Sequence, residues 1–128
     1  MMSTSFVGVD LSQAAFQQEP GNGISFLFAN LQGASLAGAM LNEAEFAMVK
    51  ARDASFVGAS LNKCEFKLAD VSGADFRGAS LIEADFTEAT VNGADLTGAV
   101  LCDALSNCAD LEMVRGAMVG VSPGYRPP

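Results

Sequence analysis

A large apolar residue, usually Leu or Phe, recurs at every fifth position over most of this chain, and Ala usually stands two residues before it. The register runs from Thr4 to Met118 through 23 consecutive units without an insertion. We call the Leu/Phe position the centre and the Ala position its partner. Centres are apolar in 20 of the 23 units and partners in 21, whereas the other three positions are mostly small or polar.

A period of five fits neither a helix nor a continuous strand. Five helical residues leave successive centres rotated by about 140°, so they would spread around the whole cylinder. An odd period on a strand sends successive centres to opposite faces. Partner and centre, two apart, do share one face of a short extended segment. Each unit is therefore predicted to be a short extended piece followed by a corner, where Gly and small polar residues supply the turn.

The placement of Phe predicts the number of sides. Eight of the nine Phe are centres, at positions 6, 16, 26, 46, 56, 66, 76 and 86. In a four-sided coil of 20 residues they fall on two opposite sides, while a three-sided coil of 15 would scatter them. Gly38, Gly58, Gly78 and Gly98 repeat with the same period. The pattern predicts an all-β, four-sided coil of about five to six turns stacked about 4.8 Å apart.

Units such as ADLTG and ADFRG resemble the consensus of the pentapeptide-repeat family, and the resemblance covers Thr4 to Met118. It implies a right-handed quadrilateral β-helix. It implies little about activity, because the members of this family are functionally diverse.

The ends of the chain depart from the repeat. Residues 1–118 are predicted to form the repeat domain, with a defective unit, EPGNG, at 19–23. Residues 10–18 fit either a first β-coil or a short N-terminal capping helix with Asp10 or Ser12 as its N-cap, and both alternatives stay open. Residues 119–128 are rich in Pro, which predicts an extended C-terminal tail.

Composition narrows the possible chemistry. The 128 residues include no His, which excludes Ser/His and Cys/His nucleophile pairs and His-bound metals. We expect no enzymatic activity, no cofactor and no metal site. Fifteen acidic and seven basic residues give a net charge of −8, so a protein that binds nucleic acid directly by neutralising phosphates is not expected.

Targeting signals and cysteines add little. The first ten residues hold no basic residue and no long apolar run, so we expect a cytoplasmic protein that does not bind membranes, unless a leader was removed. Three cysteines cannot all pair within one chain. Cys64 is a partner and is predicted to be buried, whereas Cys102 and Cys108 lie outside or at a corner near the C-terminal end.

The acidic residues are concentrated in one segment, which holds nine acids and one base between residues 69 and 112. A DNA mimic that inhibits or protects a type II topoisomerase is one interpretation. A solvated acidic surface is the favoured one, because the segment is only about 11 Å tall and its acids point from several sides. The candidate acidic surface comprises Asp70, Asp75, Glu83, Asp85, Glu88, Asp95, Asp103, Asp110 and Glu112.

A second candidate surface is apolar. Phe28, Met48 and Leu68 are spaced by 20 at an outward position, with Leu27 and Ala47 beside the first two. Stacked outward apolar residues indicate a contact surface. The alternatives are that the N-terminal segment folds over this strip, or that its side chains lie flat on the wall. The sequence therefore favours a non-catalytic binding or scaffold module that contacts another protein, as a monomer or a weak homodimer.

Overall fold

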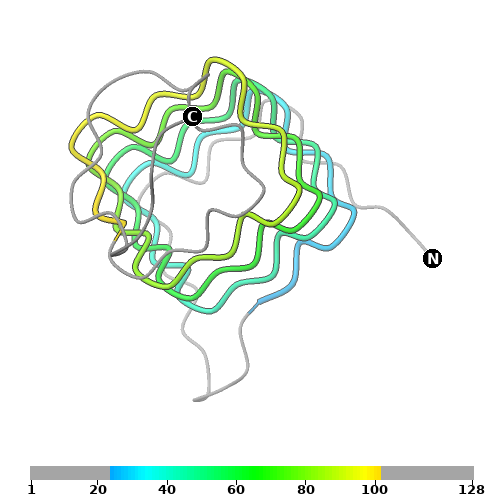
Figure 1. Ribbon diagram of the computed structural model, residues 1–128, viewed down its shortest axis with the longest axis horizontal. Helices are drawn as coiled ribbons and strands as arrows, with labels where there is room; N and C mark the ends of the chain where they lie inside the picture. The colour runs from blue at the N-terminus through cyan, green and yellow to red at the C-terminus, as the bar shows by residue number, and fades with distance from the viewer. Residues whose placement is uncertain (1–23, 102–128) are drawn as a thin grey trace.

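The computed structural model describes residues 24–101, nearly four coils of the predicted column. Within this range there is no helix, and the extended structure consists of single bridging residues separated by two-residue turns. Every bridge is parallel and joins residues 20 apart, as Ser25 to Glu45 and Glu45 to Glu65. Successive coils overlay as a four-sided outline in Figure 1. The bridges confirm the 20-residue period.

Four sides and four corners describe the coil. The bridging residues of sides 1 to 4 are 25/45/65/85, 30/50/70/90, 35/55/75/95 and 40/60/80/100. The corner that follows each side holds two turn residues per coil. These are 27–28, 47–48, 67–68 and 87–88 at corner 1; 32–33, 52–53, 72–73 and 92–93 at corner 2; 37–38, 57–58, 77–78 and 97–98 at corner 3; and 42–43, 62–63 and 82–83 at corner 4.

Backbone hydrogen bonds repeat from unit to unit. At side 1, Phe26 N donates to Glu45 O at 2.7 Å, and Glu45 N donates back to Ile24 O at 2.9 Å. Across corner 1, Ala29 N donates to Phe26 O at 2.8 Å and closes a β-turn. The second corner residue donates to the next coil, as Gly33 N does to Arg52 O at corner 2. Only the N–H of the first corner residue takes no part in this pattern.

The core consists of the partner and centre columns, as predicted. From Phe26 to Leu101 every residue of the two columns is buried. Phe26, Phe46, Phe66 and Phe86 stack with ring centroids 4.8–5.0 Å apart, and Phe56 and Phe76 stack from the opposite side at 4.9 Å. The two stacks meet edge to face, at 5.7–6.0 Å. Phe on two opposite sides is thus confirmed.

Cys64 replaces Ala at a partner position and is fully buried, as predicted. Its Sγ donates to Leu41 O at 3.0 Å. Burial raises the pKa of the thiol to about 12, so Cys64 stays protonated in the folded protein.

Several predictions concern residues outside the described range. They are the total of five to six coils, the two alternatives for residues 10–18, the defective unit at 19–23, the tail at 119–128, and the positions of Cys102 and Cys108. They stay predictions. Residues 24–101 contain no helix that could span a bilayer.

Candidate functional site

The second residue of every corner between 28 and 98 has a positive φ, between 55° and 74°. Such a conformation suits Gly and costs most other residues about 1 kcal/mol. Gly occupies all of corner 3 and all of corner 2 except Asp53, whereas corners 1 and 4 contain none at this position. The eight residues other than Gly are Phe28, Glu43, Met48, Asp53, Lys63, Leu68, Glu83 and Glu88.

Corner 1 brings the five predicted apolar contact residues together. Phe28, Met48 and Leu68 occupy the same position in three consecutive coils, and Leu27 and Ala47 precede the first two. Met48 is 41% exposed and Leu68 is 53% exposed, while the other three are half-buried. These five residues are called the apolar strip. The alternative in which the N-terminal segment folds over the strip concerns residues outside the described range.

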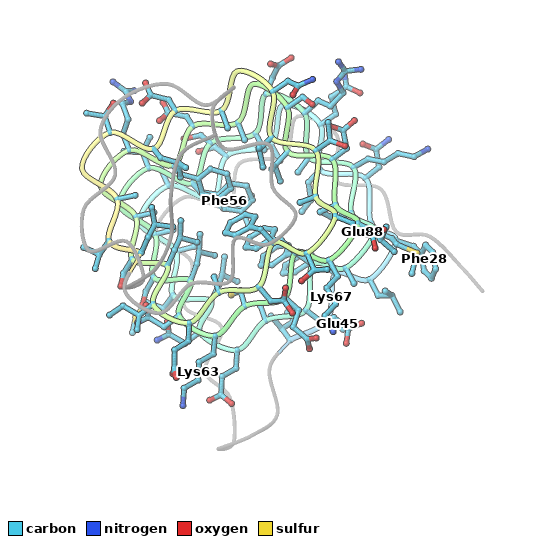
Figure 2. The ribbon with its side chains drawn as sticks, in the orientation of Figure 1. Phe28, Glu45, Phe56, Lys63, Lys67 and Glu88 are labelled. Carbon is cyan, nitrogen blue, oxygen red and sulfur yellow. The ribbon has the colours of Figure 1, made fainter. Side chains whose placement is uncertain are left out.

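Charged residues border the apolar strip along side 1 and at one end. In the fourth coil Glu88 takes the place of the apolar corner residue, 20 residues after Leu68, and Figure 2 shows it at the same corner as Phe28. Side 1 contributes stacked carboxylates at Glu45, Glu65 and Asp85. Lys67 at corner 1 pairs with Asp85, at 3.7 Å between Nζ and Oδ2. Neither Glu45, Glu65 nor Glu88 forms an ion pair with any residue of 24–101.

The acids of the candidate acidic surface scatter around the coil. Side 1 has Asp85, side 2 has Asp70, side 3 has Asp75 and Asp95, corner 4 has Glu83 and corner 1 has Glu88. The remaining three, Asp103, Asp110 and Glu112, lie outside the described residues. The six described acids of the candidate acidic surface thus form no continuous ridge along one side.

Four of these acids have a structural task that the sequence analysis missed. Each accepts a hydrogen bond from the backbone N–H two residues later. This N–H belongs to the first corner residue and takes no part in the backbone hydrogen-bond pattern. The N···O distances are 2.9–3.1 Å, for Asp70 to Ser72, Asp75 to Arg77, Asp85 to Thr87 and Asp95 to Thr97. Ser25, Asn30 and Ser55 do the same in other units. A short acceptor just before the centre is the sequence signal.

At corner 4 the N–H of the first corner residue donates instead to an Asn side chain of the preceding coil. Asn42 Oδ1 accepts from Asn62 N at 2.9 Å and from Ser60 Oγ at 2.7 Å. Asn62 Oδ1 repeats the arrangement with Ile82 N at 3.0 Å and Ser80 Oγ at 2.6 Å. Asn42 and Asn62 therefore form a structural ladder.

Basic residues neutralise several carboxylates locally. Arg77 makes a two-pronged contact with Asp75, at 2.9 Å from Nε to Oδ1 and 2.7 Å from the terminal nitrogen to Oδ2. These hydrogen bonds lower the pKa of Asp75. Lys63 lies in the column between Glu43 and Glu83 and pairs with Glu83 at 3.9 Å. Residues 24–101 contain no group of three or more potential ligands that could hold a metal ion.

A polar depression of about 410 Å³ lies over corner 2. Its lining residues are Gln32, Arg52, Asp53, Ser72, Gly73 and Asn92. Asp53 folds over Gly73, where an added Cβ would lie 2.3 Å from Asp53 Oδ1. The hydroxyl of Ser72 donates to Asp70 Oδ1 at 2.7 Å. The depression offers hydrogen-bonding groups, but no imidazole or lysine amine stands beside its hydroxyl to act as a base.

Comparisons with solved structures show the fold. Rfr23, a pentapeptide-repeat protein from the cyanobacterium Cyanothece 51142, is 22% identical with a TM-score of 0.67, over 74% of this chain and 63% of Rfr23. A pentapeptide-repeat protein from the thylakoid lumen of Arabidopsis thaliana is 27% identical with a TM-score of 0.47, over 77% of this chain and 67% of that chain. Trypsin-treated QnrB1, a plasmid-mediated fluoroquinolone resistance protein, is 19% identical with a TM-score of 0.47, over 96% and 82%. This chain therefore spans less than two thirds of the length of Rfr23.

No curated protein matches the sequence. The model of the family "Pentapeptide repeats (8 copies)" matches residues 29–67 and 64–103, more than half of the chain. The fold of this chain is the right-handed quadrilateral β-helix that the family match and the structure of Rfr23 imply. The repeating turns, the parallel bridges 20 residues apart and the family match agree, and the chain belongs to the pentapeptide-repeat family.

Proposed function

We propose that this protein is a non-catalytic binding or scaffold module that contacts another protein through the apolar strip. One observation carries the proposal. Three large apolar residues stand at exposed or half-exposed, positive-φ corner positions in consecutive coils, whereas the opposite corner has Gly in all four coils.

The strip gains little from the fold itself. Phe28, Met48 and Leu68 each occupy a conformation that costs about 1 kcal/mol for a residue with a Cβ. Met48 and Leu68 keep 41% and 53% of their surface in water, and burial of the rest offsets a cost of about the same size, so the net gain to folding is small. Contact with a second molecule would remove the remaining apolar area from water. Corner 4 has the same conformation at Glu43, Lys63 and Glu83, so the apolar side chains rather than the strain distinguish corner 1.

Absence of catalysis is part of the same proposal. The chain has no His, and the hydroxyls and carboxylates around corner 2 hold turns together. A module of this kind needs no cofactor or metal and acts through shape, charge and exposed apolar area.

Affinity capture and sedimentation test the proposal. The double variant Met48→Glu/Leu68→Glu places two charges on the strip and should lose partners that the wild type captures from its native host. The matched control is Met40→Glu, because Met40 is 52% exposed but lies on side 4. Capture and sedimentation that are unchanged in the double variant would rule out the strip as the contact surface.

Charge mimicry of duplex DNA is the weaker alternative. Four of the six described acids of the candidate surface hold turn amides, and the six are distributed around the coil. A supercoiling assay with purified gyrase tests it directly. Absence of inhibition at micromolar protein would exclude mimicry, whereas inhibition that survives Met48→Glu/Leu68→Glu would favour it over the strip.

A further inference from the structure

We infer that the partner element on the apolar strip is an amphipathic α-helix with basic residues beside its apolar stripe, lying along the axis of the coil. The inference rests on the proposed function and names the chemistry of the partner. Two features of corner 1 carry it: the spacing of the apolar side chains and the sign of the charge around them.

The spacing of the strip matches a helix better than an extended segment. Phe28, Met48 and Leu68 follow the coil rise of about 4.8 Å, so the three span about 10 Å. Helix residues at i, i+3 or i+4, and i+7 share one face and span about 10.5 Å at 1.5 Å per residue. Same-face residues of a strand are about 6.6 Å apart, and three of them span about 13 Å. A helix therefore keeps three contacts in register.

The charge around the strip is negative. Glu45, Glu65, Asp70, Asp85 and Glu88 border it, against the two bases Lys50 and Lys67. Lys67 is already paired with Asp85, and Asp70 is paired with Arg52 of corner 2, which leaves Glu45, Glu65 and Glu88 against Lys50. Glu45 and Glu65 stack in adjacent coils without an ion pair to any residue of 24–101, so two like charges face solvent side by side. Lysine or arginine beside the apolar stripe of a partner would relieve that repulsion.

The end of the strip gives the partner a direction. The column reads Phe28, Met48, Leu68 and then Glu88, so the three apolar positions are followed by one carboxylate. Figure 2 shows Phe28 and Glu88 at the same corner, with Glu45 on side 1 next to it. A helix with three apolar residues followed one turn later by a basic residue fits this order. A second copy of this chain fits less well, because it brings the same carboxylates and a net charge of −8.

Fluorescence anisotropy with three labelled 18-residue peptides tests the inference. The first has a Leu stripe at i, i+3, i+7 and i+10 flanked by Lys; the second replaces each Lys by Glu; the third has the composition of the first with the stripe scrambled. We expect the first peptide to bind at least tenfold more tightly than the other two. Its affinity should fall as salt rises, since exposed charges contribute.

Variants of the protein test whether the first peptide binds at the apolar strip. Met48→Ser/Leu68→Ser should weaken the first peptide at least tenfold, and Glu45→Gln/Glu65→Gln should weaken it several-fold and flatten its salt dependence. The matched control Met40→Ser should stay within twofold of wild type. Equal binding of the scrambled or the acidic peptide, or binding unaffected by Met48→Ser/Leu68→Ser, would overturn the inference.

The two proposals fail in different ways. If no peptide binds while Met48→Glu/Leu68→Glu still abolishes capture of the native partner, the basic-helix inference is wrong and the contact surface stands. If capture is also unchanged, the proposed function fails. A wild-type dimer in sedimentation equilibrium that Met48→Ser/Leu68→Ser dissociates would replace the helix by a second copy of this chain.

Discussion

Corners 1 and 3 lie opposite each other and share the same interior but not the same exterior. Phe stacks line both sides from within, and the backbone at both corners has the same positive φ. Outside, corner 3 repeats Gly38, Gly58, Gly78 and Gly98, whereas corner 1 has Phe28, Met48, Leu68 and Glu88. The inner columns therefore determine the coil, whereas the residue type at the outer corners can vary without changing the backbone.

The largest expected effect comes from the shared interior. Phe66→Ala on side 1 and Phe56→Ala on side 3 should each lower the free energy of unfolding by about 3–5 kcal/mol, because both rings are fully buried in stacks. Urea unfolding measures this. Since the two rings touch edge to face with centroids 6.0 Å apart, the double variant should not be additive. Additive losses would show that the two sides do not share one interior, and a loss below about 1 kcal/mol for either ring would contradict the predicted size of the effect.

An intermediate effect on the free energy of unfolding is expected when Gly at a corner is replaced by Ala, and two such variants separate backbone strain from a steric clash. Gly78→Ala at corner 3 should cost about 1 kcal/mol, since φ is +68° and nothing lies within 4 Å of the new Cβ. Gly73→Ala at corner 2 should cost about 0.5–1.5 kcal/mol more, because Asp53 must move. In an Asp53→Gly background the two substitutions should cost the same by urea unfolding. If Gly73→Ala still cost more than Gly78→Ala in that background, the extra cost could not be due to Asp53.

The smallest effect concerns charge beside corner 3. Arg77 lowers the pKa of Asp75, so this pair adds stability above the ordinary carboxyl pKa of about 3.9, and the contribution is lost as pH falls through the lower, folded pKa. Arg77→Ala should raise the pKa of Asp75, as measured by NMR titration of the carboxyl carbon. An unchanged titration midpoint would show that Arg77 does not set it.

The sequence predicted the inside of the coil better than the outside. The period, the buried columns and Phe on two opposite sides follow from spacing, because close packing repeats the same requirement in every coil. The positive φ of Glu43, Lys63 or Leu68 could not be read from residue type, since the fold imposes that conformation even where Gly is absent. Asp70 and Asp85 were read as surface charge, although each also accepts the N–H of a turn.

The free energy of unfolding of Met48→Gly/Leu68→Gly, from urea denaturation, tests most directly the claim that corner 1 is apolar for contact rather than for folding. Gly relieves the positive-φ strain of both residues while removing two largely exposed side chains. The account predicts a stability within about 1 kcal/mol of the wild type, or higher. A loss of about 2 kcal/mol or more would contradict it, because Met48 and Leu68 would then be structural residues.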